Sequence, residues 1–267
     1  MFGKKLPIEF SQLGSYISLL LICLLSNPQN ALTQTRPNNQ AIESNSIQFR
    51  QPQLPDNGAP EGRRRGGTSR DGCPSLSSSL TALVPGQETE GEASLSASFL
   101  ATTISEYPTF WVYLPQLPQN TRSGEFVLQD EEGIDIYRTS LALPESGGIV
   151  GMNLPSSAPA LKIGKKYHWY FQLYCGEPDT QPEYFFVDAW IERVALSPEM
   201  ATQLQAKQTQ KYLVYAKHSL WYDALTDLAN RHSNNPNNER LKNDWVELLK
   251  SVGLQDLAFE SVFVQHR

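Results

Sequence analysis

Histidine, cysteine, serine and acidic side chains are the residues of this sequence that could carry out catalysis or bind a metal. The four histidines lack the i, i+4 or His-x-His spacing of a metal site, and neither a G-x-S-x-G nor an S-x-x-K motif occurs. The glycine-rich run at residues 62–67 contains three arginines and neither follows a strand-like run nor opens a helix-like one, unlike a phosphate-binding loop. The sequence therefore predicts no catalytic residue, no metal site and no cofactor.

Paired carboxylates are the remaining route to acid and base catalysis. Asp130, Glu131 and Glu132 fall in a turn-like stretch, where exposure alone explains their charge, and Asp188 alternates into a strand-like run beside Trp190. We therefore expect a protein that is not an enzyme. A hydrolase with noncontiguous catalytic residues is the weaker alternative.

Aromatic side chains offer a binding face instead. The run Lys166–Cys175 alternates with the period of two that is typical of a strand, so one set of side chains should face the core. The expected core set is Tyr167, Trp169, Phe171 and Leu173, and the opposite set, the candidate ligand face, is His168, Tyr170, Gln172 and Tyr174. Aromatic rings among polar neighbours on a sheet are how many carbohydrate-binding modules stack sugars.

The composition narrows the class of protein. The chain has 267 residues, 40% hydrophobic and 19% charged, which fits a globular protein rather than a disordered chain or a multi-span membrane protein. Its formal net charge of −6 argues against a nucleic-acid partner, which would need a basic field.

The first 33 residues have the pattern of a signal peptide. Lys4 and Lys5 precede an apolar run of ten residues, 16–25, which is too short to span a bilayer as a helix. Ala31 or Thr33 could mark cleavage, and retention as an uncleaved anchor is left open. Cys23 follows Ile22 rather than a small residue, which disfavours lipidation. After cleavage no membrane span is expected, and the protein should be periplasmic or secreted.

The next segment, residues 34–70, is rich in Asn, Gln, Pro, Gly and Arg and is expected to be a disordered linker. Loss of the signal leaves two cysteines, Cys73 and Cys175. In an oxidising compartment such a pair predicts a single structural disulfide.

Short strand-like runs fill residues 71–196 and indicate one β-sandwich domain. The eight candidate strands are Leu80–Val84, Ser94–Ala101, Thr109–Leu114, Glu125–Gln129, Ile134–Leu141, Ile149–Leu154, Lys166–Cys175 and Tyr184–Leu196. Few helical patterns separate them, which favours an antiparallel, immunoglobulin-like sandwich. Leu161 lies six residues before Tyr167, as in a tyrosine corner. Eight strands joined only by hairpins would, however, place Cys73 and Cys175 at opposite ends, so either one run is not a strand or the Cys73 segment loops back.

Helical periodicity begins at residue 197 and defines a C-terminal helical region, 197–267. Ser197 and Pro198 form a well-supported helix start. Two further apolar patterns, from Trp221 and from Leu241, predict a helical hairpin that ends near Gly253. The predicted fold is thus mainly β with α: a sandwich followed by a helical hairpin.

Several segments in order resemble the domain of unknown function 928 family, reported from cyanobacteria. They are RRRGGTSRDGCP, LTALVPG, PTFWVYLP, FVLQDEEG, LKIGKKYHWYF, WIERVALSP and LWYDALTDLA. The resemblance implies an export signal, a β-rich body and a helical end, and it carries over no activity and no catalytic residues. Gln116 and Leu117 follow Pro115, where the family leads us to expect an aromatic residue.

Together these features predict an exported envelope protein that acts as a non-enzymatic protein-interaction module, with an envelope protein as its partner. The alternative is a carbohydrate-binding module with a glycan partner, held by exposed aromatic residues of the sandwich.

Overall fold

The computed structural model describes residues 47–51, 62–66, 73, 75–86, 99–117, 123–144, 146–175, 183–206 and 210–265. The predicted signal peptide lies outside these residues. The chain divides into residues 1–44 and residues 45–267, and every described residue belongs to the second unit. No helix within the described ranges is long and apolar enough to cross a membrane.

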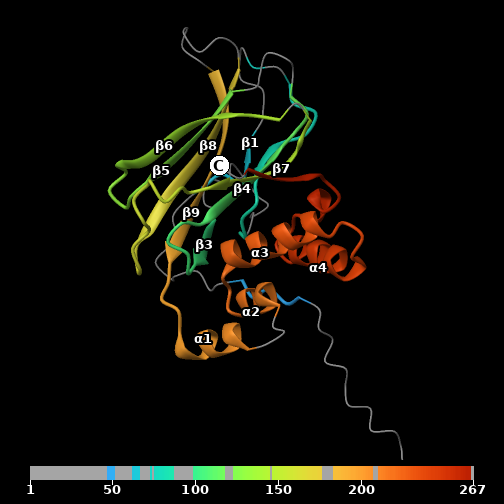
Figure 1. Ribbon diagram of the computed structural model, residues 1–267. Coiled ribbons are helices and arrows are strands. Elements are labelled where there is room, and N and C mark those ends of the chain that lie inside the picture. Colours follow the sequence, from blue (N-terminus) through green and yellow to red (C-terminus); the bar gives the residue numbers. More distant parts are fainter. Residues whose placement is uncertain are drawn as a thin grey trace, which may run out of the picture. The chain divides into compact units, whose positions relative to one another are not determined.

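Ten strands in the described part of the chain form two five-stranded sheets (Figure 1). The first sheet has the order β1(Arg65–Gly66), β2(Leu80–Ala82), β4(Thr109–Leu114), β7(Gly148–Asn153) and β10(Val262–Gln265). The second has the order β3(Leu100–Thr103), β9(Glu183–Arg193), β8(Lys166–Cys175), β5(Ser123–Gln129) and β6(Asp135–Ala142). Seven of the eight predicted strands are present, with ends that differ by up to three residues. The predicted strand Ser94–Ala101 shares only Leu100 and Ala101 with β3, and residues 94–98 lie outside the described part of the chain. Strands β1 and β10 were not predicted.

Both sheets are mixed, so the predicted antiparallel, immunoglobulin-like arrangement is not confirmed. Strand β3 runs parallel to β9, with Leu100 opposite Trp190. Strand β10 runs parallel to β7, with Val262 opposite Ile149. The prediction assumed that each strand pairs through hairpins, but an alternating pattern identifies the two faces of a strand and not its neighbours.

The two sheets pack face to face through aromatic side chains. The ring of Phe110 on β4 lies 4.7 Å from that of Phe126 on β5 and 5.5 Å from that of Trp169 on β8. Trp111 points to the other side of β4, so this strand is buried along its whole length. A side chain at Gly151, opposite Trp111, would clash with the indole at 2.8 Å, which explains the glycine.

Four helices follow the sheets. They are α1(Pro198–Gln205), α2(Lys211–Lys217), α3(Trp221–Asn234) and α4(Glu239–Lys250), and a short 3-10 helix, η1(Gln255–Leu257), precedes β10. The Ser197 hydroxyl accepts the Met200 N–H at 3.2 Å and caps α1, as predicted. The predicted hairpin corresponds to α3 and α4. Helix α2 was not predicted as a separate element.

Buried indoles join α3 to the sheets. Three tryptophan N–H groups donate across this junction: Trp111 to the Thr226 hydroxyl (3.0 Å), Trp169 to the Tyr222 hydroxyl (2.8 Å) and Trp221 to the Leu83 carbonyl (2.8 Å). A buried N–H without a partner costs about 1–3 kcal/mol. These bonds therefore hold α3 in one position against both sheets.

A disulfide joins Cys73 to Cys175, as the sequence predicts, with Cα atoms 5.4 Å apart. Cys175 is the last residue of β8. Hairpins between all of the strands would have placed the two cysteines at opposite ends of the sandwich. The sheets contain parallel pairs, so this conflict does not arise.

Two parts of the predicted linker lie against the folded unit. Residues 47–51 contact the helices, and residues 62–66 connect the two sheets: Arg63 pairs with Asp188 of β9, and β1 pairs with β2. Arg64 is buried and donates to the Val252 carbonyl at 2.6 Å. The polar composition suggested disorder, but an arginine whose guanidinium binds a backbone carbonyl can be buried.

We predict that Tyr222→Phe lowers the free energy of unfolding by about 1–3 kcal/mol, because it leaves the Trp169 N–H buried without an acceptor. Urea denaturation measures the change. The matched control is Tyr137→Phe on β6, because no hydrogen bond joins its partly buried hydroxyl to the described residues. An equal effect of the two substitutions would contradict the role assigned to Tyr222.

We also predict an unusual pH dependence from Asp223, whose carboxylate accepts the Ile104 N–H at 3.1 Å. Burial raises its pKa from 3.8 to about 6, against the opposing hydrogen bonds from Thr103 and Ile104. The folded state therefore binds a proton that the unfolded state has lost, and the stability that this proton contributes disappears as the pH rises from 4 through 6.

In Asp223→Asn this loss should be absent. The free energy of unfolding of Asp223→Asn, relative to that of the original protein, should be higher at pH 7 than at pH 4 by about 1–3 kcal/mol, as measured by denaturation at both pH values. A substitution effect that is the same at pH 4 and pH 7 would refute this assignment.

Candidate functional site

The candidate ligand face lies on the outer side of the second sheet. Along β8 the predicted core set is buried, and the alternate side chains, His168, Tyr170, Gln172 and Tyr174, are half-buried. Strand register places a β9 residue opposite each of these four: Trp190, Asp188, Phe186 and Tyr184 respectively. Two strands therefore contribute one continuous aromatic and polar surface, which we call the β8–β9 face.

A hydrogen-bonded chain crosses this face. Nε2 of His168 lies 2.7 Å from Oδ2 of Asp188, and the Tyr170 hydroxyl lies 2.6 Å from Nδ1 of His168. Oδ1 of Asp188 accepts the Arg63 N–H at 2.9 Å, and the Asp188 residue is only 6% exposed. In a neutral imidazole whose Nε2–H donates to this carboxylate, Nδ1 accepts from the Tyr170 hydroxyl.

This chain has the order of a hydrolytic triad, carboxylate to imidazole to hydroxyl, but a phenol replaces the serine. Burial, and then the negative charge of Asp188, raise the pKa of Tyr170. A nucleophile is activated by the opposite change. The arrangement therefore holds Tyr170 in its neutral form and fixes the position of the rings.

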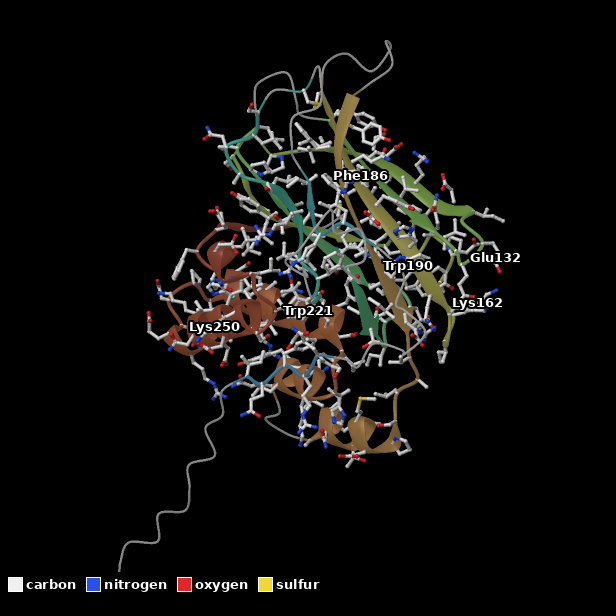
Figure 2. All side chains as sticks on the ribbon, turned by 180° about the vertical axis from the view of Figure 1, so that it is seen from behind. Glu132, Lys162, Phe186, Trp190, Trp221 and Lys250 are labelled. Atoms are coloured by element: carbon white, nitrogen blue, oxygen red, sulfur yellow. A yellow bond between two sulfur atoms is a disulfide. The ribbon has the colours of Figure 1, made fainter. Side chains whose placement is uncertain are left out.

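The rings of the β8–β9 face cover one another. The His168 imidazole stacks on Trp190 with centroids 4.4 Å apart and 7° between the planes. The centroid of the Tyr170 ring lies 4.1 Å from that of His168. The Arg63 guanidinium lies 4.4 Å from the centre of the Phe186 ring. Figure 2 shows Phe186 and Trp190 along the same strand. Sugar stacking needs a free ring face, and among these residues only Tyr184 is exposed, at 47%.

A charged rim borders these rings on β5 and β6. The Tyr174 hydroxyl donates to Glu125 at 2.9 Å, and burial followed by this hydrogen bond raises the pKa of Tyr174 to about 12. Arg138 binds Glu125 and also Asp135, the latter at 2.7 Å. The Arg138 side chain is 50% exposed, so a cation remains accessible at the edge of the face.

A pocket of about 310 Å³ lies at the β5–β6 hairpin, where Figure 2 shows Glu132 and Lys162 close together. It is lined by Asp130, Glu131, Glu132, Ile136, Pro159, Ala160, Lys162, Lys165, Lys166 and Tyr167. Its volume is at the lower end of the range for ligand sites. The sequence predicted the acidic turn but not the lysines, which come from the loop before β8 and from the first residue of that strand.

Three of the carboxylates considered for catalysis, Asp130, Glu131 and Asp188, already have partners. Asp130 accepts the N–H groups of Glu132 and Ile134, at 3.1 and 2.9 Å, and so stabilises the turn. Glu131 binds the Lys165 ammonium at 2.7 Å, which lowers the pKa of Glu131. In the part of the chain that the structure describes, no cluster of three or more His, Cys, Asp or Glu residues could hold a metal ion.

The sequence identified one strand of the β8–β9 face but not the partners of its residues. Asp188 was considered as a catalytic carboxylate and Trp190 as its neighbour in a strand-like run, whereas Glu125 was not singled out. The alternation of β9 could have placed Tyr184, Asp188 and Trp190 on one side, but only the strand register brings them beside β8.

We predict that His168→Leu lowers the free energy of unfolding by about 1–3 kcal/mol, because it leaves a buried Asp188 oxygen without a donor. The matched control is Gln172→Leu, on the same face of the same strand. Its effect should be smaller, since Tyr174 retains its bond to Glu125 when Gln172 is lost. Thermal unfolding compares the two variants, and a loss for Gln172→Leu as large as that for His168→Leu would argue against this role.

Comparison with known proteins identifies the family of this chain. A comparison with curated protein sequences finds no match. A family model described as Domain of Unknown Function (DUF928) matches residues 65–262, from the start of β1 to the first residue of β10. The match covers about three quarters of the chain and includes both the β8–β9 face and the four helices. The chain therefore belongs to the DUF928 family.

Proposed function

We propose that this protein is an exported, non-enzymatic interaction module of the cell envelope that binds a partner protein through the β8–β9 face. The observation that carries the proposal is the arrangement of this face: aromatic rings packed on one another, with their polar atoms hydrogen-bonded among themselves. Such a surface is already ordered before a partner arrives, so little side-chain entropy is lost on binding.

The chemistry of the face supports a protein partner. Tyrosine, tryptophan and arginine dominate binding energy at protein interfaces, and this face carries Tyr184 and Trp190 with Arg138 at its rim. Helix α3 packs mainly against β3, β4 and β10 and reaches β8 at Trp169, on the buried side of that strand, and Figure 1 places β5, β6 and β8 on the side away from α3 and α4. The helices therefore leave this face available.

Export is supported by two features. The first 33 residues have the pattern of a signal peptide, and the bond between Cys73 and Cys175 suits an oxidising compartment. The proposal that the protein is not an enzyme rests on two observations. The pKa of Tyr170 is raised, which disfavours a nucleophile, and Glu131 of the hairpin is bound by Lys165.

Site-specific photo-crosslinking tests the proposal. A photoreactive residue at Tyr184 of the full chain should capture one envelope protein, and Arg138→Glu in the same chain should reduce the crosslinked product by about tenfold. The control is Lys250→Glu, at an exposed lysine of α4, which should leave the product unchanged.

Two results would overturn the proposal. One is a crosslinked product that Arg138→Glu does not reduce while the variant keeps the melting temperature of the original protein. The other is retention of the purified protein on a polysaccharide column that Tyr184→Ala abolishes, because this would establish the glycan-binding alternative instead.

A further inference from the structure

A second binding surface lies among the helices, where residues 47–51 cross α2, α3 and α4. This segment is extended, with Ile47 and Phe49 turned inward and Gln48 and Arg50 exposed. We call these five residues the N-terminal segment and the surface under them the helical groove.

The helical groove presents hydrogen-bond acceptors to the backbone of the segment. Oδ1 of the buried Asp244 accepts the Ile47 N–H at 3.3 Å, and the Ala216 carbonyl in the last turn of α2 accepts the Arg50 N–H at 3.4 Å. The Ser251 carbonyl after α4 accepts from the Gln51 side chain at 3.3 Å. Carbonyls at helix C-termini carry the negative end of the helix dipole and favour a further donor, as the Ala216 carbonyl does beside the Ser219 N–H, which it accepts at 3.2 Å.

The groove also presents an apolar contact. The Phe49 ring lies 4.9 Å from that of Trp221, nearly perpendicular to it. Trp221 is fully buried, and the segment covers it. The preferred occupant is therefore an extended peptide with apolar side chains at positions i and i+2 and a backbone N–H donor at i+3, which is the pattern of Ile47, Phe49 and Arg50.

Two observations indicate that this occupant can be exchanged. The three hydrogen bonds that join the segment to other described residues are longer than the usual 2.9–3.0 Å, so these polar contacts are weak. The family match, residues 65–262, contains the whole groove but not the segment. The groove is thus part of the family domain, whereas the peptide that fills it comes from outside the matched region.

We propose that the helical groove is a peptide-docking site: the N-terminal segment occupies it as an intramolecular ligand, and a partner protein binds by supplying an extended segment of the same pattern in its place. Ten residues separate Gln51 from Gly62, and a connection of this length gives an effective concentration in the millimolar range. A free peptide therefore competes poorly until the segment is released.

Cleavage of the connection tests the proposal in the full chain. A specific protease site replaces residues 53–59, and a labelled peptide with the sequence of residues 44–52, SNSIQFRQP, is the probe. The cut protein should bind this peptide at least about tenfold more tightly than the uncut protein does, by fluorescence anisotropy. A matched peptide with serine in place of both Ile47 and Phe49 should not bind.

A substitution provides a second measurement without cleavage. Phe49→Asp should release the segment and increase the affinity for the same peptide, whereas Gln48→Asp, at an exposed position of the segment, should not. If Phe49→Asp fails to fold, peptide binding by the cut protein still tests the proposal.

Three results would overturn the proposal. One is a cut protein that keeps its own fragment on dilution and takes up no peptide, which would make the segment a permanent structural element. Another is equal binding of the matched serine peptide. The third is a dimer of two cut chains in native mass spectra in place of peptide binding, which would assign the groove to a second copy.

Discussion

The buried indole N–H groups are the constraint on which the arrangement of this protein depends. Trp111 and Trp169 lie on different sheets, and both donate to side chains of α3, while Trp221 of α3 donates back to the Leu83 carbonyl. Each donor is buried, so each must keep its partner or lose about 1–3 kcal/mol. A single helix thereby fixes the positions of both sheets.

This constraint also decides which surfaces remain for binding. Because α3 lies against β4, the strand is buried on both faces, and the outer face of β8 and β9 is left to the solvent. The polar groups of that face are then stabilised by one another rather than by a covering element, as in the chain from Asp188 through His168 to Tyr170. The same helix places Trp221 under the N-terminal segment, so one element supports both proposed surfaces.

The sequence predicted the local elements well and the long-range pairings poorly. Alternation identified β8 with its correct bounds and both of its faces, and Ser197 with Pro198 identified the start of α1, because these signals are local. Strands β1 and β10 were missed because two and four residues carry no measurable alternation, and β10 has a parallel partner distant in the chain. For the same reason the candidate face was found on one strand only, since Asp188 reaches His168 through strand register.

The segment from 62 to 66 shows how composition alone can mislead. Arginine and glycine usually indicate a solvated linker, but here each has a packing role. Gly66 lies so close to the Phe186 carbonyl that a Cβ atom would approach its oxygen to 2.3 Å, and Arg65 pairs with Asp256 near the C-terminus. A strand that must pass between two sheets needs a residue without a side chain at the closest approach, and a guanidinium can reach distant carbonyl and carboxylate acceptors. The apparent linker is therefore the connection that closes the edge between the sheets, and the family match begins within it, at Arg65.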